Sequence, residues 1–251
     1  MTDRPILFSG PMTRALLEGR KTQTRRILKP QPPADMGLVG VYAPALTAVF
    51  GYVTPDADFK VPLRYMPGDR LWVREAWKPI PKSRPGGYFV PGSPFYGLDA
   101  FYQADGNCPL WANGPWKPSI HMPRWASRLT LIITDVRVER LQEISEADAL
   151  AEGVIHQDPT PDDEDWNLRW SAEQGLAPEP MSPVWLAPGT RQDYGPRRDE
   201  PLWGPTPEFA FRLLWDSLNA SRGFGWDANP WVVALTFNVI RQNIDAMGEA
   251  A

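Results

Sequence analysis

The sequence predicts an α+β fold, in which short strands and a few helices are joined by long loops. Several apolar runs are typical of strands, whereas only two or three segments carry the spacing or capping residues of a helix. Too few helices alternate with strands for a doubly wound parallel sheet. Neither glycine-rich phosphate loop, GxGxxG or GxxxxGK followed by Ser or Thr, occurs. We therefore expect one α+β domain over residues 1–251.

The N-terminal segment is expected to hold one strand and one helix. Residues 5–8 form a short apolar run that predicts a strand. Residues 11–18 begin with proline and carry apolar side chains on one side, which indicates a helix. Gly19 then suits the C-terminal cap of this helix. A dense polar block, residues 20–26, follows.

The middle of the chain predicts strands and one capped helix. A turn signal at residues 66–70 leads into an expected strand at 71–77. Residues 129–141 approximate a period of two, which predicts a strand pair or one long bent strand. Ser145 opens a helix with a capping-box pattern, and Gly153 ends it.

The C-terminal part predicts one amphipathic helix and a last strand. Residues 208–218 form the helix, and residues 231–240 form the strand. The helix carries one apolar stripe, made of Phe211, Leu214, Trp215 and Leu218.

Three stretches are expected to be loop insertions. They lie near residues 30–62, 78–122 and 156–205 and are rich in proline, glycine or isolated tryptophan. The whole chain has 29 Pro and 12 Trp. Because so many aromatic side chains cannot stay in water, we interpret the chain as a folded domain with Pro-rich and Trp-rich surface loops.

Composition excludes several function classes. Lys plus Arg is 26 and Asp plus Glu is 30, so the formal charge of −4 argues against a surface built to grip duplex DNA. One Cys and two His exclude an intramolecular disulfide and disfavour a structural zinc site. No run of 18 apolar residues and no secretory signal is visible, so we expect a cytoplasmic protein without a membrane segment.

The block at residues 20–26 contains a lysine and a hydroxyl three positions apart, Lys21 and Thr24. In a helix or turn they share one face, whereas in a regular strand they point to opposite faces. A lysine beside a hydroxyl is a known base and nucleophile pair. The alternative interpretation is a solvated helix end, where cations favour the carbonyl terminus.

A lysine that acts as a base must lose its proton. Nearby cations and partial burial lower the pKa of Lys21, and Arg20, Arg25 and Arg26 are close in sequence. Spacing does not determine which carboxylate orients this lysine. Glu152 and Glu75 are both open candidates.

The same block resembles the G-x-K-x-x-T-x-R signature of the ASCH family. Gly19, Lys21 and Thr24 match, and Arg26 takes the final arginine. Residues 67–73 resemble the turn that enters a barrel strand in this family, and residues 145–153 resemble its short helix. The longer sequence is similar to phage and prophage proteins with this domain.

This resemblance implies a PUA-like fold, which is a small β-barrel with flanking helices, here enlarged by the insertions. Small bacterial members are similar to amidohydrolases that cleave N4-acetylcytidine to cytidine and acetate. Their active site holds a Lys, a Thr and a Glu and uses no metal or other cofactor. The resemblance assigns these roles to Lys21, Thr24 and, through the short helix, Glu152.

The resulting hypothesis is hydrolysis of an N4-acylated cytidine or cytosine-type amide, a small-molecule substrate. Arg20 or Arg26 would stabilise the oxyanion or bind the base, and Glu75 is a further candidate at the substrate. Trp72, Trp77 or Tyr102 would stack on the pyrimidine, although core packing is the alternative for each tryptophan.

The second hypothesis is an RNA- or modified-nucleotide-binding module, or a ribonuclease. The cations at residues 20–26, with Lys29, Arg124 and Arg128, could follow a phosphate backbone. The net negative charge argues against this reading. A third hypothesis is a structural or interaction protein of a phage.

Overall fold

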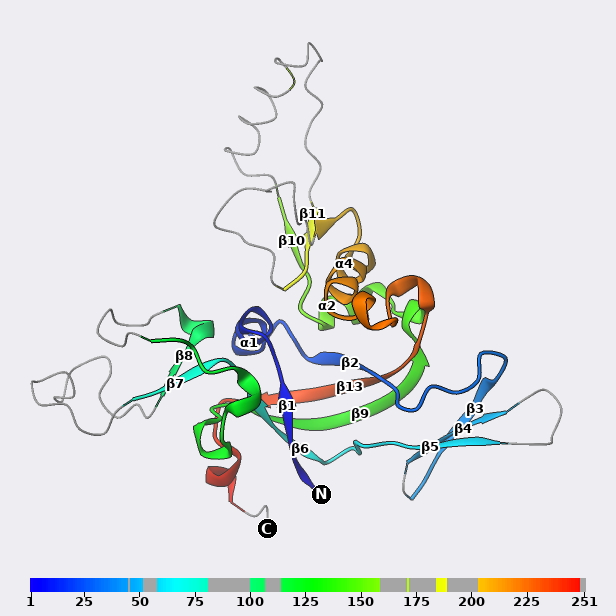
Figure 1. Ribbon diagram of the computed structural model, residues 1–251, viewed down its shortest axis with the longest axis horizontal. Coiled ribbons are helices and arrows are strands. Elements are labelled where there is room, and N and C mark those ends of the chain that lie inside the picture. The colour runs from blue at the N-terminus through cyan, green and yellow to red at the C-terminus, as the bar shows by residue number, and fades with distance from the viewer. Residues whose placement is uncertain are drawn as a thin grey trace, which may run out of the picture. The chain divides into compact units, whose positions relative to one another are not determined.

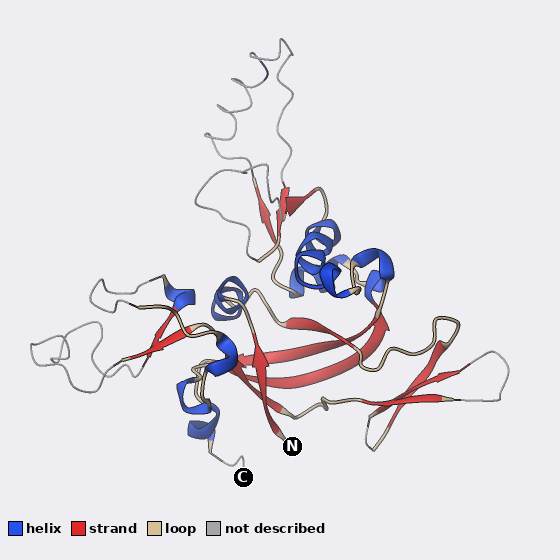
Figure 2. Ribbon diagram, in the orientation of Figure 1, coloured by secondary structure: helices blue, strands red, loops and turns tan. Residues whose placement is uncertain are grey.

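A computed structural model of the chain describes residues 1–44, 46–51, 58–80, 100–106, 114–158, 171, 184–188 and 203–248. Helices and several separate sheets occur together, so the fold is α+β, as predicted (Figures 1 and 2). The chain divides into two compact units. Unit 1 comprises Met1–Gly19, Tyr65–Asp135 and Phe237–Ala251, and unit 2 comprises Arg20–Arg64 and Val136–Thr236.

The described elements have the following bounds. The strands are β1 Asp3–Leu7, β2 Gln23–Ile27, β3 Gly37–Tyr42, β4 Thr47–Gly51, β5 Phe59–Pro62, β6 Arg70–Arg74, β7 Trp77–Pro79, β8 Ala100–Tyr102, β9 Thr130–Arg140, β10 Ile155–Gln157, β11 Val184–Leu186, β12 Trp203–Gly204 and β13 Trp231–Ile240. The α-helices are α1 Gly10–Leu17, α2 Glu146–Ala151 and α4 Pro207–Asn219. Short 3-10 helices are η1 Gln103–Asp105, η2 Ser119–His121, η3 Arg124–Ala126, η4 Leu141–Glu143, η5 Ala220–Arg222, η6 Trp226–Ala228 and η7 Ile244–Met247.

The largest sheet has five strands in the order β1-β6-β9-β13-β2. β1 pairs with β6 in parallel, whereas β6 with β9 and β13 with β2 are antiparallel. Within the described residues this sheet is open, with β1 and β2 at its edges, so the small closed barrel stays an expectation.

The two long strands agree with the sequence-based prediction. β13 has the predicted bounds, and its residues 231–235 are all buried. Such a continuous apolar run is typical of a strand covered on both faces. Residues 129–141 form one long curved strand, β9, rather than a strand pair (Figure 1).

The three predicted helices are present. α1 has proline in its first turn, and Gly19 after it adopts φ = +75°, a left-handed conformation that glycine tolerates. α2 is capped by the Ser145 hydroxyl, which accepts a hydrogen bond from the Asp148 backbone N–H at 3.2 Å.

The apolar stripe of α4 differs from the prediction at its last position. Phe211, Leu214 and Trp215 are buried, but Leu218 is 47% exposed. The buried residue of the last turn is Asn219, whose side-chain amide donates to the Trp215 carbonyl at 3.0 Å. The buried face thus continues at a spacing of four residues instead of three.

The strand predicted over residues 71–77 is two strands. β6 ends at Arg74, and β7 begins at Trp77. Glu75 lies at the break, where its backbone N–H donates to the Met122 sulfur at 3.2 Å instead of to a neighbouring strand. A buried carboxylate at this position needs its own partners, and these interrupt the strand.

The stretches read as loops also contain strands. Residues 30–62, predicted to be loop-like, carry the antiparallel sheet β3-β4-β5 with a buried core that includes Ala48, Phe50 and Val61. The described parts of 78–122 and 156–205 contain β7-β8 and β10-β11-β12. These strands were not predicted because they are short runs between prolines and glycines. The rest of those two stretches lies outside the described residues.

Candidate functional site

The predicted polar block runs along the C-terminal end of α2. The Thr22 backbone N–H donates to the Ala151 carbonyl at 2.8 Å, and the Lys21 amine donates to the Glu152 carbonyl at 3.0 Å. The Arg20 guanidinium donates to the Gly153 carbonyl at 3.0 Å. The last carbonyls of a helix lack partners within the helix, and here consecutive residues of one segment supply them. This binding aligns the start of β2 with α2.

The alignment places Lys21 on the Glu152 carboxylate. The Lys21 amine donates to Oε2 of Glu152 and forms an ion pair with it. Lys21 is 0% exposed and Glu152 is 3% exposed. Of the two carboxylates left open by the sequence, Glu152 is thus the one that contacts Lys21.

The second oxygen of Glu152 faces Arg25. Oε1 accepts the Arg25 backbone N–H at 2.7 Å and lies 3.5 Å from a guanidinium nitrogen of the same residue. Both oxygens of this buried carboxylate therefore have donors, as burial of a charge requires.

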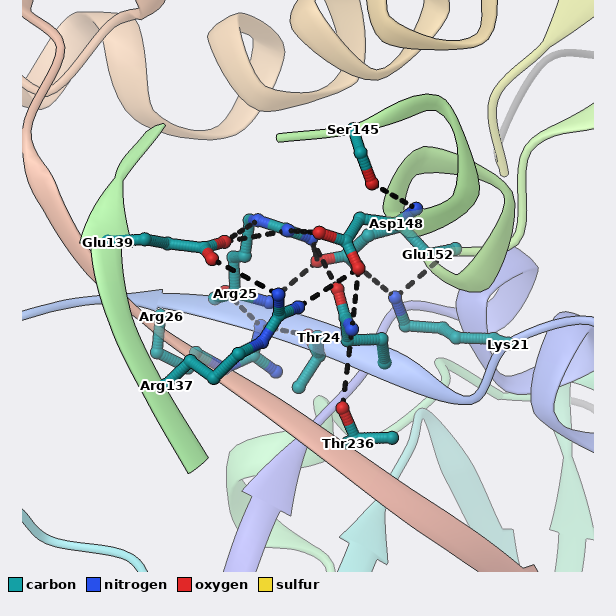
Figure 3. Close-up of polar contacts among 11 residues, drawn as sticks. Lys21, Thr24, Arg25, Arg26, Arg137, Glu139, Ser145, Asp148, Glu152 and Thr236 are labelled. Carbon is teal, nitrogen blue, oxygen red and sulfur yellow. Dashed lines mark hydrogen bonds and ion pairs between the residues drawn. The ribbon is translucent and has the colours of Figure 1, made fainter. Parts of the chain in front are cut away.

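Arg25 is itself held from several directions (Figure 3). Its Nε donates to Glu139 at 2.9 Å, one terminal nitrogen contacts Asp148 at 2.9 Å, and the other donates to Gln23 at 2.7 Å. The Phe211 ring lies 5.8 Å from the guanidinium carbon. The Arg25 side chain is completely buried. These contacts therefore replace the water molecules that its guanidinium loses on burial.

Asp148 links Arg25 to a half-exposed arginine, Arg137. It accepts hydrogen bonds from Gln23 at 3.0 Å and from the half-exposed Arg137 at 2.9 Å. Burial alone raises the pKa of Asp148, but the Gln23 and Arg137 hydrogen bonds and the charge of Arg25 outweigh it and lower the pKa. Gln23 also reaches the Thr236 hydroxyl on β13 at 3.3 Å.

We name the six charged residues of this group the buried ionic cluster. It contains equal numbers of cations and anions, namely Lys21, Arg25, Arg137, Glu139, Asp148 and Glu152. Within it, burial lowers the pKa of Lys21, the Glu152 carboxylate opposes that shift, and the charges of Arg26 and Arg25 add to it. Lys21 therefore gives up its proton more readily than an exposed lysine.

Thr24 lies on β2, opposite Leu235 of β13, and is 2% exposed. Its hydroxyl accepts a hydrogen bond from the Arg26 guanidinium at 3.0 Å. The segment is not the helix or turn that would put Lys21 and Thr24 on one face. Lys21 lies before β2, which begins at Gln23. The alternation of side chains in a regular strand therefore does not fix the direction of Lys21 relative to Thr24.

The other predicted site residues belong to unit 1 and have partners there. Glu75 is 1% exposed and forms a two-pronged ion pair with Arg128, with N–O distances of 2.9 and 3.0 Å. Burial raises the pKa of Glu75 in spite of this partner. Trp72 and Trp77 are both buried, and the Arg74 guanidinium stacks on Trp72 at 5.0 Å. Both tryptophans therefore follow the core-packing alternative.

Sequence reasoning missed Arg25, Glu139 and Asp148 as members of the cluster. One signal was available, because Asp148 and Glu152 are four residues apart on one helix and so share a face. Residues 23 and 25 likewise share one face of a strand. The contribution of Glu139 depends on β9 passing nearby, which no local spacing encodes.

Two kinds of feature are absent from the described residues. No group of three or more His, Cys, Asp or Glu side chains there could hold a metal ion. No helix among them is long and apolar enough to span a membrane.

The comparisons with known proteins found no matching family model, no matching curated protein and no matching solved structure.

Proposed function

We propose that the protein is a metal-independent amidohydrolase that cleaves an N4-acylated cytidine or cytosine-type amide. The observation that carries this proposal is the buried contact between the Lys21 amine and the Glu152 carboxylate. The resemblance to the ASCH family assigned catalytic roles to these two residues, which are far apart in the sequence.

The electrostatics of the pair suit general base catalysis. A general base works best when its pKa lies near the working pH, and burial lowers the pKa of Lys21 in that direction. Glu152 fixes the amine through both its carboxylate and its backbone carbonyl. A fixed amine holds its lone pair in one direction once the proton has left.

In the proposed reaction, the Thr24 hydroxyl attacks the amide carbonyl carbon and Lys21 accepts the hydroxyl proton. The amide C–N bond then breaks, and the ammonium of Lys21 returns that proton to the leaving nitrogen. Water attacks the resulting ester on Thr24, again losing its proton to Lys21. The carboxylic acid leaves, and the Thr24 hydroxyl recovers its proton.

Arg26 is the better candidate for oxyanion stabilisation among the two arginines considered. Its guanidinium already donates to the Thr24 hydroxyl oxygen at 3.0 Å, so it lies beside the atom that would attack. Arg20 donates to the Gly153 carbonyl instead. A donor placed in advance needs little rearrangement during the reaction.

Burial sets a condition on this chemistry. Because Lys21 and Thr24 are almost inaccessible, an amide can reach them only if covering side chains move when the substrate binds. As part of the same proposal, the five-stranded sheet would supply strands of a PUA-like barrel.

The RNA-binding alternative has less support. Several of the cations that would follow a phosphate backbone already have carboxylate partners: Arg25 is in the buried ionic cluster, Arg124 pairs with Asp3 and Asp245, and Arg128 pairs with Glu75. A paired cation contributes less to phosphate binding, because it must first leave its carboxylate.

The test is hydrolysis of N4-acetylcytidine, followed by chromatography, with wild type and the variants Lys21→Met, Thr24→Ala and Glu152→Gln. We expect turnover by wild type and its loss in the first two variants. Circular dichroism of each variant shows whether it is folded. A folded wild type that cleaves neither this amide nor longer N4-acyl analogues would contradict the proposal.

A further inference from the structure

The Glu152 carboxylate depends on Arg25 for the second of its two oxygens. Lys21 contacts Oε2, while Oε1 accepts the Arg25 backbone N–H at 2.7 Å and has the Arg25 guanidinium at 3.5 Å. A carboxylate held at one oxygen can rotate about its last bond, whereas contacts at both oxygens fix its plane. Arg25 thus supplies the second point of attachment.

The guanidinium can serve as a support because it is itself immobile. Glu139 on β9, Asp148 on α2 and Gln23 on β2 each accept hydrogen bonds from it at 2.7–2.9 Å. These acceptors come from three elements of unit 2. The planar fork of arginine fits several acceptors at once, and lysine lacks this geometry.

We infer that Arg25 is a positioning residue: its guanidinium, held by Glu139, Asp148 and Gln23, keeps this part of β2 in place, so that the Arg25 backbone N–H holds the Glu152 carboxylate against Lys21. Arg25 is outside the sequence signature, whose fixed positions here are Gly19, Lys21, Thr24 and Arg26. For its effect on the reaction rate, this inference rests on the proposed function. For its effect on Lys21 itself, it rests on the position of the two cations at the two oxygens of the same Glu152 carboxylate.

Arg25 has a second, electrostatic effect on Lys21. The charged groups that face Lys21 are Glu152 at the end of α2 and Arg25 and Arg26 on β2. Glu139 and Asp148 face Arg25 from β9 and α2. The cationic charge of Arg25 lowers the pKa of Lys21, so its removal should raise that pKa.

Two substitutions separate the geometric effect from the charge effect. Arg25→Gln removes both the fork and the charge, whereas Arg25→Lys removes the fork and keeps a charge. We expect both to lower kcat up to about 100-fold, the scale of a small misplacement of a catalytic group, with little change in KM. Only Arg25→Gln should also move the acidic limb of the kcat/KM profile to higher pH.

The matched control is Arg137→Gln. Arg137 pairs with the same two acidic residues, Glu139 and Asp148, but is half-exposed. We expect it to lower kcat by less than about fivefold, as is typical of an exposed ion pair. A merely structural role for Arg25 predicts lower thermal stability with an unmoved pH limb in Arg25→Gln.

Removal of a buried cation can prevent folding, so a charge-balanced variant accompanies the single ones. Arg25→Gln combined with Asp148→Asn removes one cation and one anion. In this variant and in wild type, an NMR titration of the Lys21 side-chain carbon, assigned with Lys21→Met, reports its pKa without any substrate. We expect the higher pKa in the variant.

The outcomes distinguish the two proposals. If wild type is inactive but the Lys21 titration moves as expected, the proposed function fails and the electrostatic role of Arg25 stands. If wild type is active and both Arg25 variants keep its kcat and its pH limb, the positioning role is overturned and the proposed function stands. An unmoved Lys21 titration in the charge-balanced variant overturns the electrostatic part.

Discussion

The Lys21 amine contacts Glu152 twice, through the side-chain carboxylate and through the backbone carbonyl at 3.0 Å. The two contacts differ in kind, because the second one belongs to the binding of residues 20–22 along the end of α2. The contacts of residues 20–22 with the end of α2 therefore hold both partners of the ion pair in place. This anchoring holds the fully buried lysine against Glu152.

Loss of the anion alone should destabilise the fold strongly. In Glu152→Gln, the buried Lys21 loses the counter-charge of Glu152, and we expect the free energy of unfolding to fall by about 3–5 kcal/mol at neutral pH. Urea denaturation measures this change. The double variant Lys21→Met with Glu152→Leu should recover a large part of the loss. Equal losses in the single and double variants would contradict a buried charge pair.

The stability should depend on pH through Lys21. Burial lowers its folded-state pKa below the ordinary value of 10.5, so the unfolded chain binds more protons over the interval between the two pKa values. The free energy of unfolding of wild type, minus that of Lys21→Met, should therefore increase as pH rises toward 10.5. It should decrease as pH falls through the folded-state pKa. Denaturation at several alkaline pH values checks the sign, and a difference that shrinks as pH rises would show a raised pKa instead.

The cap of α2 should affect both stability and turnover. Ser145→Ala removes the side-chain acceptor at the start of this helix and should cost about 1 kcal/mol of stability. The same helix carries Asp148 and leads to Glu152, so kcat should fall as well. Thr206→Ala removes the equivalent cap of α4 and is the control, with a similar loss of stability and a smaller loss of kcat. If Ser145→Ala and Thr206→Ala lowered kcat equally, the cap of α2 would have no specific effect on the site.

Glu75 should matter for stability and not for the reaction. Its carboxylate pairs with Arg128, which also contacts Asp105. Glu75→Gln should keep kcat close to wild type while it changes the denaturation midpoint. Because burial raises the pKa of Glu75, its protonated form contributes stability that is present below the ordinary value of 4.5 and is lost as pH rises through the raised pKa. Loss of turnover in Glu75→Gln, together with an active Glu152→Gln, would contradict this assignment. Glu75 would then serve the reaction and Glu152 the stability of the fold.

Local signals predicted the three α-helices and the strands β1, β6, β9 and β13. A proline near its start and Gly19 after its end predicted the limits of α1, and Ser145 and Gly153 predicted the limits of α2. These limits can be predicted from the sequence because a cap acts within one turn of the helix. The apolar run at 231–240 predicted β13 without error. The sheet β3-β4-β5 escaped prediction, since its strands are short and Gly40 interrupts β3.

The site was predictable only in part, for the same reason. Lys21 and Thr24 lie within one motif, and the resemblance added Glu152 through the helix that contains it. The surroundings of Arg25 were not predictable, because Glu139 reaches it from β9, more than a hundred residues away. Such a contact depends on tertiary packing, which a single sequence does not reveal. Trp72 and Trp77 are buried, as the core-packing alternative expects, and the sequence alone could not choose between packing and stacking for them.

The most direct measurement is the intact mass of the protein during turnover of N4-acetylcytidine, quenched with acid and followed by peptide mapping. The proposed mechanism predicts that wild type gains the mass of one acetyl group on Thr24, and that Thr24→Ala gains none and does not turn over. Hydrolysis of the amide by a folded Thr24→Ala variant, or an acetyl group carried by a different residue, would contradict it.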